Sequence, residues 1–345
     1  MTRDGRLPEL LAPAGSPEAL RAAVEGGADA VYFGASGFNA RAGARNFSDT
    51  ELRRAVEFCH GRGVRVYLTL NTLIYDRELR DYLAAAETAY LAGVDALIVV
   101  DIGGAAALRR TFPDLPLHAS TQMSGHSVGC AKELASLGFE RMVLAREMSF
   151  ADIAGFTRTS PIEAEVFIHG ALCVCHSGQC LFSSMVGGRS GNRGECAQPC
   201  RLPYNGGKYP LSLKDNCLAG HIPELIDAHV ASLKIEGRMK GPDYVGPVTA
   251  VYRRLLDGHR AATPEEIGYL AEIFSRSGFT DAYFTGNISH AMLGTRTEAD
   301  KRRSAGRTVP YETKRGLPAV AVPSRAHKAD EYLPVKPHNK PVKRR

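Results

Sequence analysis

Short apolar segments typical of β-strands alternate with helical segments along most of the chain, and this alternation constrains the fold more than any other feature. The helical segments have apolar residues three and four positions apart and stop at glycine, as helices do. Strands that alternate with helices form parallel sheets, and eight such units are the number that closes a barrel. The eight expected strands are 9–13, 30–34, 65–71, 96–101, 116–121, 141–146, 164–170 and 231–237. The sequence therefore predicts an α/β fold, a (β/α)8 TIM-type barrel.

An open, doubly wound parallel sheet is the alternative fold for the same alternation. No G-x-G-x-x-G follows the first expected strand, so the main argument for a dinucleotide-binding fold is missing. The spacing is regular except between the seventh and eighth strands, where about sixty residues replace a normal loop and helix. We therefore expect a long Cys-rich insertion between strands 7 and 8 of the barrel.

Three regions follow from this pattern. Residues 1–260 are predicted to form the barrel domain, including the Cys-rich loop 171–217, and residues 261–300 a short carboxy-terminal helical extension. Residues 301–345 hold 13 Lys and Arg against 3 Asp and Glu, are rich in proline and show almost no apolar periodicity. We expect a basic disordered tail there, which either binds RNA or is simply solvated.

Polar side chains follow the ends of several expected strands. In a barrel the loops after the strand carboxyl ends carry the reactive groups, so these side chains are candidates for ligand contact and catalysis. Some polar residues at such places only cap the following helix, as Ser16 and Ser48 are expected to do. The candidates for ligand contact are Asn71, Gln122, Arg146, His169, Glu236 and Arg238.

Cysteine is distributed very unevenly along the chain. Of the 8 cysteines, six fall in the 45 residues from 173 to 217: Cys173, Cys175, Cys180, Cys196, Cys200 and Cys217. The start of the chain has no secretory h-region, and no apolar run is long enough to span a membrane, so a cytoplasmic protein is expected. In a reducing cytosol, clustered thiols indicate metal binding, redox chemistry or catalysis rather than disulfides. Cys59 and Cys130 lie in helical segments and are expected to be buried apolar residues.

Three kinds of cysteine site are open on this evidence. Iron–sulfur clusters and structural zinc both use four cysteines, but the C-x2-C pairs typical of zinc are absent, and the irregular spacing favours a cluster. A cysteine nucleophile with His169 or His176 as its base is the third kind, although it needs only one reactive thiol. Ser127 lies in a G-x-S-x-G sequence, but six residues past the expected strand, so we predict a helix cap rather than a second nucleophile.

Basic residues accompany the clustered cysteines, and only two carboxylates, Glu195 and Asp215, oppose them. Such a positive balance favours contact with the phosphates of a nucleic acid or with another anionic substrate, while solubility is the plain alternative. The basic residues are Arg189, Arg193, Arg201 and Lys208.

Several segments, in a fixed order, resemble the U32 family, long described as collagenase-like peptidases. They are ELLAPAGSPEALRAAVEGGADAVYFG near the start, E-x-F-x2-GALC-x4-G-x-C-x-FS from Glu165 to Ser183, GNRGECAQPCR at 191–201, SLKDNC at 212–217 and SLKIEGRMKGPDYV at 232–245. The resemblance covers roughly residues 8 to 300. It implies a barrel-like domain that holds a [4Fe-4S] cluster through Cys173, Cys180, Cys196 and Cys217, with Cys200 as the alternative for the third or fourth place.

Several members of this family support oxygen-independent hydroxylation, and prephenate is implicated as the hydroxyl donor in the RNA reactions. Segments 274–286 and 294–301 look most like the branch that acts on a 23S ribosomal RNA cytidine, which usually has a further carboxy-terminal domain that is not expected here. The resemblance thus implies an Fe–S-dependent enzyme that supports pyrimidine C5 hydroxylation of rRNA or tRNA, with the six strand-end residues holding base and donor. A U32 peptidase is the first alternative, and a non-catalytic RNA-binding or assembly partner is the second.

Overall fold

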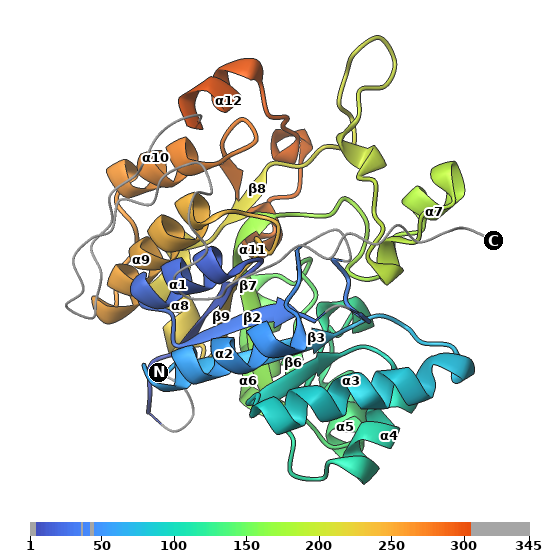
Figure 1. Cartoon of the computed structure of the whole chain (residues 1–345). Helices are drawn as coiled ribbons and strands as arrows, with labels where there is room; N and C mark the ends of the chain where they lie inside the picture. The colour runs from blue at the N-terminus through green and yellow to red at the C-terminus, as the bar shows by residue number, and fades with distance from the viewer. Residues whose placement is uncertain (1–4, 36, 42–44, 305–345) are drawn as a thin grey trace.

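Eight parallel strands form a closed barrel at the centre of the computed structural model, which describes residues 5–35, 37–41 and 45–304 (Figure 1). The barrel strands are β1 (Glu9–Pro13), β2 (Ala30–Gly34), β3 (Arg65–Leu70), β4 (Ala96–Val99), β5 (Leu117–Ala119), β6 (Phe139–Val143), β7 (Glu163–Ala171) and β9 (Ser232–Ile235). Neighbours in the chain pair in parallel, and β9 pairs with both β7 and β1. The predicted barrel and its eight strands are confirmed, and the open-sheet alternative is wrong because β9 bonds to β1.

Helices surround the barrel and connect its strands. They are α1 (Pro17–Glu25), α2 (Asp49–His60), α3 (Leu79–Ala92), α4 (Ile102–Thr111), α5 (Val128–Ser136), α6 (Phe150–Thr159), α8 (Ile222–Asp227) and α9 (Pro242–Asp257). Ser16 caps α1, and Ser48 forms a capping box with Glu51 at the start of α2, as expected. Ser127 caps α5 through the backbone N–H of Cys130, so the G-x-S-x-G serine is a helix cap.

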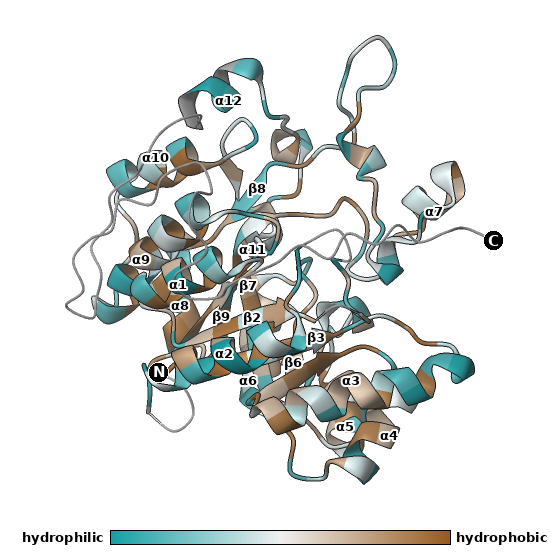
Figure 2. Cartoon of the chain, viewed as in Figure 1, coloured by the Kyte–Doolittle hydropathy of each residue, from teal (hydrophilic) through white to brown (hydrophobic). Residues whose placement is uncertain are grey.

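The alternation of side chains along the strands divides the apolar residues into two cores. Leu10 and Ala12 of β1 belong to the large cluster between the barrel and its helices, whereas Leu11 points the other way. Leu11 packs inside the barrel with a small group that includes Tyr32 and Tyr67. Figure 2 shows the hydrophobic colour on the strands and the hydrophilic colour on outward turns of helices such as α2 and α3. Strands buried on both faces are expected for a parallel barrel.

Charged side chains fill part of the barrel interior. Arg141 Nη1 on β6 lies 2.7 Å from Glu9 Oε1 and 3.4 Å from Glu165 Oε2. Lys234 Nζ on β9 lies 2.7 Å from the other oxygen of Glu165, and Tyr67 donates a 2.6 Å hydrogen bond to Glu9. All of these residues are buried. Buried charges persist only when each is paired, so the four ionic groups depend on one another.

The insertion between β7 and β9 forms a lobe above the barrel rather than a barrel unit. It contains α7 (Phe182–Gly187), short 3₁₀ turns and β8 (Asp215–Cys217). Strand β8 runs antiparallel to the end of β7, where His169 is paired with Cys217, and it also pairs with β10 (Phe279–Thr280). The Cys-rich segment is therefore held to the barrel at β8, and residues beyond 261 contribute a strand to that attachment.

The carboxy-terminal part of the chain begins with α10 (Pro264–Ile273), followed by α11 (Ala282–Thr285) and α12 (Glu298–Ser304). Helix α12 ends at Ser304, within the first residues of the predicted tail, 301–345. The tail prediction for 305–345 falls outside the described residues. Of the two isolated cysteines, Cys59 is fully buried as expected, but Cys130 is only half-buried because α5 leaves that face partly open.

We predict that the ion pairs inside the barrel are essential to its stability. Arg141→Leu leaves Glu9 and Glu165 buried with one cation fewer, so the free energy of unfolding should fall by about 3–5 kcal/mol. Urea denaturation followed by circular dichroism measures this. Arg158→Leu, at an exposed position on α6, is the control and should change the free energy by less than about 0.5 kcal/mol. Equal losses in both variants would contradict a special role for the interior charges.

A thiol-lined pocket at the mouth of the barrel

A pocket of about 650 Å³ opens where the carboxyl ends of the barrel strands meet the Cys-rich insertion. Barrel residues form its floor, and residues 171–201 of the insertion form much of its wall. Of the predicted strand-end residues, five line it and one does not. The five are Asn71, Gln122, Arg146, Glu236 and Arg238.

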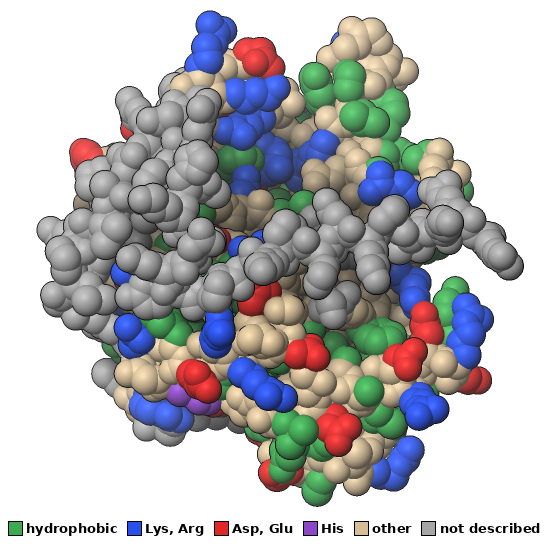
Figure 3. All heavy atoms as spheres, in the orientation of Figure 1, with side chains coloured by type: hydrophobic (Ala, Val, Ile, Leu, Met, Phe, Trp, Pro, Cys, Tyr) green, Lys and Arg blue, Asp and Glu red, His purple; other side chains and the backbone are tan. Residues whose placement is uncertain are grey.

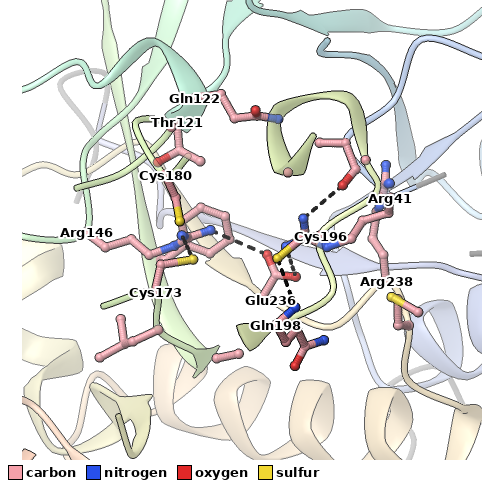
Figure 4. Close-up of a pocket in the computed structure, with 18 of the residues that line it drawn as sticks. Arg41, Thr121, Gln122, Arg146, Cys173, Cys180, Cys196, Gln198, Glu236 and Arg238 are labelled. Carbon is pink, nitrogen blue, oxygen red and sulfur yellow. Dashed lines mark hydrogen bonds and ion pairs between the residues drawn. The ribbon is translucent and has the colours of Figure 1, made fainter. Parts of the chain in front are cut away.

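Glu236 is the central anion of the pocket floor (Figure 4). Its carboxylate lies 3.2 Å from Arg41 Nη2 and 3.7 Å from Arg146 Nη2. Burial opposes ionisation of Glu236, but the charges of Arg41, Arg146 and Arg238 outweigh it, and the pKa of the carboxyl is lowered. Glu236 is therefore ionised at neutral pH, and it holds two arginines at the barrel axis.

Arg238 occupies the floor beside this group. It donates hydrogen bonds to Thr69 on β3 and to Asn39 Oδ1, the latter at 2.7 Å. Burial and the neighbouring Arg41 lower the pKa of Arg238 to about 10, so it still carries its charge at neutral pH. Gly15 makes this position possible, because a Cβ there would lie 1.8 Å from the carbonyl oxygen of Arg238.

Asn71 and Gln122 lie on the opposite side of the floor. Asn71 accepts a 3.0 Å hydrogen bond from the backbone N–H of Ala40 and donates a 3.2 Å bond to Ser120 Oγ. Gln122 donates a 2.9 Å hydrogen bond to the backbone carbonyl of Asn71. Asn71 is thus largely committed to holding the backbone at Ala40, while the side-chain oxygen of Gln122 accepts no hydrogen bond from the described residues.

Five of the six clustered cysteines line the pocket: Cys173, Cys175, Cys180, Cys196 and Cys200. All are reduced. Arg146 Nη1 lies 3.7 Å from Cys173 Sγ, so one arginine contacts both Glu236 and a thiol. Figure 4 places Cys173 and Cys180 together beside Arg146, and Cys196 across the pocket near Glu236 and Arg41. The thiols therefore face one cavity from two sides.

His169 and Cys217 do not line the pocket, although the sequence placed both among the site residues. His169 is buried, and its Nδ1 lies 3.1 Å from the hydroxyl of Tyr252. Burial, with a smaller effect of Lys240, lowers the pKa of His169 to about 3, so the ring is neutral. Cys217 is paired with His169 in the sheet, and its Sγ lies 3.6 Å from the same Tyr252 hydroxyl. Both face Tyr252 of α9, on the helix side of β7 and β8, a position that only strand pairing defines.

The cysteine loop is attached to the barrel between Cys175 and Cys180. Glu147, at the end of β6, accepts hydrogen bonds from the backbone N–H and the hydroxyl of Ser177. Gly178 has φ +78°, and a Cβ there would lie 2.1 Å from the carbonyl oxygen of Gln122. Only glycine permits both the backbone conformation and the close approach.

The pocket carries a strong excess of positive charge. Its lining includes eight cations, namely Arg41, Arg146, Arg189, Arg201, Arg238, Arg276, Lys234 and Lys240. It includes three carboxylates, namely Glu195, Glu236 and Asp215. Of the basic residues noted near the cysteines, Arg189 and Arg201 line the pocket, whereas Arg193 is paired with Glu78 at 2.7 Å.

Several pocket residues were not identified from the sequence. Arg41 follows β2, and Lys240 comes two residues after Arg238. Both lie after strands, so they could have been predicted as ligand contacts for the same reason as the other strand-end residues. Arg276 and Phe274 had no such signal, because they precede β10 in the carboxy-terminal extension and reach the pocket only through the pairing of β10 with β8.

The donor set is suited in kind to a thiolate-bound centre, because five cysteines converge on one cavity and cluster ligation takes four. The thiols also affect one another electrostatically. Burial raises the pKa of Cys200 and of Cys175; Cys173, Cys180 and Cys196 raise that of Cys200 further, and Cys180 raises that of Cys175. Within the described residues, no three Cys, His or acidic side chains already stand in one coordination shell. Binding of such a centre would therefore require the two sides of the pocket to close on it.

The fold and the pocket define a class of protein: an α/β barrel whose functional face is built jointly by the strand ends and a Cys-rich insertion. The chain belongs to Peptidase family U32, whose sequence model matches residues 15–293. The resemblance drawn from the sequence motifs is thereby confirmed.

Proteins similar to this chain carry different functional names. The chain is 43% identical over 294 residues to a 23S rRNA 5-hydroxycytidine synthase of Escherichia coli, covering 82% of this chain and 44% of that protein. It is 38% identical to tRNA hydroxylation protein P1 of Bacillus subtilis, covering 75% of this chain and 65% of that protein. It is also 35% identical to a collagenase of Porphyromonas gingivalis, covering 81% and 73%. The chain thus spans less than two thirds of the first two relatives.

The sequence predicts no membrane-spanning segment. Among the parts of the chain that the structure describes, none of the helices is both long enough and apolar enough to span a bilayer.

Lys240 is predicted to lose its proton near neutral pH. Burial, followed by the repulsion of Arg276, lowers the pKa of its ammonium to about 7, so the group is charged below that pH and neutral above it. Acetylation of Lys240 by acetic anhydride, followed by peptide mass spectrometry, should reach half its maximal rate near pH 7. The exposed Lys132 on α5, outside the pocket, is the control. Equal midpoints for both lysines would contradict the assignment.

Proposed function

We propose that this chain is an RNA-modifying enzyme that supports oxygen-independent hydroxylation of a pyrimidine at C5 in rRNA or tRNA, with the help of a [4Fe-4S] cluster. The observation that carries this proposal is the pocket itself: a cationic cavity at the barrel mouth, lined by five reduced cysteines. The names of the relatives from Escherichia coli and Bacillus subtilis supply the reaction class and the two kinds of RNA.

The charge of the pocket supports a polyanionic substrate. Phosphate contacts dominate the affinity of proteins for nucleic acids, and Lys and Arg outnumber carboxylates in the lining. A base that undergoes chemistry must leave its stack and enter a pocket, where its polar edge is read by hydrogen bonds. A volume of about 650 Å³ is ample for one nucleotide base together with a small donor molecule.

Residues of the floor have separate tasks in this proposal. Gln122 presents an amide oxygen that can accept from the edge of the base. Glu236 keeps Arg41 and Arg146 in place. Arg146 also contacts Cys173, so it connects the floor to the thiols of the wall. Prephenate, as a candidate hydroxyl donor, is a dicarboxylate that would suit the arginines of this floor. His169 is neutral and buried, and its proposed task is to support β8 rather than to touch the substrate.

An iron–sulfur cluster would supply redox or Lewis-acid chemistry within the pocket. Cys173, Cys180 and Cys196 are the proposed common ligands. The family resemblance favours Cys217 as the fourth ligand, whereas the pocket lining favours Cys200, because Cys217 is buried against Tyr252. Cytoplasmic location follows from an RNA substrate and from oxygen-sensitive cluster chemistry, and it is part of the same proposal.

Peptidase activity is the alternative that the collagenase relative favours. A cysteine peptidase needs a thiol next to a general base. Neither candidate base meets this need: His169 bonds to Tyr252, and His176 lies 3.5 Å from Glu147 with its side chain 84% exposed. Cys173 instead contacts an arginine. These contacts support the hydroxylation proposal over a thiol protease.

We predict that anaerobically purified protein contains about four iron atoms and four sulfides per chain. Cys173→Ser, Cys180→Ser and Cys196→Ser should each lose most of the iron, and Cys130→Ser, outside the pocket, should retain it. Iron analysis of Cys200→Ser and Cys217→Ser decides between the two candidates for the fourth ligand. Zinc without iron, or digestion of a protein substrate by metal-free enzyme with loss on Cys173→Ser, would contradict the proposal.

We also predict that deletion of the gene removes one 5-hydroxypyrimidine from the RNA of its host. Mass spectrometry of nucleosides from purified rRNA and tRNA detects the loss and identifies the substrate. Reintroduced Glu236→Gln should restore the modification about 10- to 100-fold less well than wild type, because Arg41 and Arg146 lose the anion that positions them. Arg158→Gln is the control and should restore it fully. Altered ribosomal or protein complexes with every hydroxyl still present would indicate a non-catalytic partner instead.

A further inference from the structure

One side of the pocket holds a second group of cations, separate from the Glu236 floor. They surround the ring of Phe274, at 2.9 Å from its centroid for Lys240 Nζ, 4.3 Å for Arg296 Cζ and 5.2 Å for Arg276 Cζ. Arg201 lies beside Arg276 and lines the same wall. An aromatic face attracts one cation by about 0.5–2 kcal/mol, which does not offset the mutual repulsion of several. The ring alone therefore does not balance the charge of this group.

Carboxylates lie near some members of this group. Asp215 alone among them lines the pocket: its Oδ1 accepts from Arg276, and its buried Oδ2 has no hydrogen-bond partner among the described residues. Asp300 accepts hydrogen bonds from the N–H and the hydroxyl of Thr297 at the start of α12, and Asp243 lies in the first turn of α9. Neither of these two reaches the cavity.

Lys240 is the clearest sign of an absent anion. Among the described residues, its ammonium has no carboxylate within 4.0 Å and no hydrogen-bond acceptor. Burial and the neighbouring arginines lower the pKa of Lys240, and they lower those of Arg201 and Arg296 as well. A half-buried cation such as Lys240 that has no partner is costly in the free protein and becomes favourable once an anion binds.

The two cationic groups of the pocket differ in what they can accept. Arg41 and Arg146 already face the ionised Glu236, so part of their charge is matched within the protein. Among the described residues, no carboxylate lies within 4.0 Å of the Lys240 ammonium; Asp215 lines the same side at a greater distance and is bonded to Arg276. Figure 3 shows Lys and Arg side chains gathered around the hollow beneath α12, so this side is also open to a ligand from outside.

We propose that Lys240 and Arg276, next to Arg201, form a phosphate-binding subsite that takes the phosphate of the nucleotide whose base enters the pocket. The proposal rests on the function proposed above and adds the part of the substrate that these residues hold. Lys binds phosphate as a point charge and Arg through a planar fork, and the two together match a phosphate group. The subsite sits at the end of β9 and beside β10, so the carboxy-terminal extension contributes directly to substrate binding.

Calorimetric titration of the full chain with cytidine, CMP, ribose 5-phosphate and inorganic phosphate at low salt tests this subsite. Wild type should bind CMP at least about 10-fold more tightly than cytidine, and added salt should weaken CMP binding and leave cytidine binding nearly unchanged. Lys240→Met should remove most of this difference while cytidine affinity stays the same. Lys240→Arg should keep it. Lys132→Met, at an exposed position on α5, is the matched control and should behave as wild type.

The outcomes separate this inference from the proposed function. Equal affinities of wild type for CMP and cytidine, or an equal loss of both in Lys240→Met, would overturn the phosphate subsite. If circular dichroism shows that Lys240→Met is unfolded, Arg276→Lys takes its place and should reduce the preference for CMP several-fold. Ribose 5-phosphate that binds as tightly as CMP would support a phosphate site for a small metabolite and overturn its assignment to a nucleotide. An intact subsite together with unchanged host RNA would leave the subsite standing and reject the RNA reaction.

Discussion

The pairing of β9 with both β1 and β7 is the interaction on which the rest of the structure depends. Because the sheet closes, the carboxyl ends of eight strands meet at one rim, and side chains that are more than a hundred residues apart face one cavity. Arg41, Arg146 and Glu236 follow three such strands, and each of the two arginines lies within 4 Å of Glu236. An open sheet would have spread the same residues along an edge.

The closed barrel encloses charged side chains, and each of them is paired with an opposite charge. Glu9, Arg141, Glu165 and Lys234 form alternating ion pairs across its interior, and Lys234 reaches the pocket floor. Above them Glu236 forms a second, half-buried ionic group with its arginines. In the interior group a buried charge that moves away from its partner loses several kcal/mol, which restrains the side chains beneath the pocket. The pocket thus combines a floor of paired charges from the barrel with a wall from the Cys-rich insertion.

The insertion and the carboxy-terminal extension act as one structural unit. Strand β8 adds to the end of β7, and β10 adds to β8, so the segment that contains the cysteines is held by residues on both sides of it in the sequence. This arrangement explains why Phe274 and Arg276 belong to the same pocket as Cys173 and Cys200. It also gives the extension a role beyond covering α9, since it completes the cationic wall.

Local sequence patterns were sufficient for much of this structure. Periodicity determined the eight strands and the helices between them, the serine caps at Ser16 and Ser48, and the location of a site after the strand ends, because each depends on residues within one or two turns of chain. Motifs in order identified the family, and cysteine spacing located the thiol loop. Residue type and strand position together placed Arg146 and Glu236 correctly in the pocket.

Only the tertiary structure decided which of these residues share a cavity. Cys217 and His169 carry the same local signals as their neighbours, but the antiparallel pairing of β8 with β7 turns them toward Tyr252 and away from the pocket. The same pairing, extended to β10, brings Arg276 beside Lys240, a contact that no local pattern contains. Charge repulsion, burial and unmet partners arise between segments distant in the chain, so the sequence determined the barrel and its thiols, and the fold determined which charges surround them.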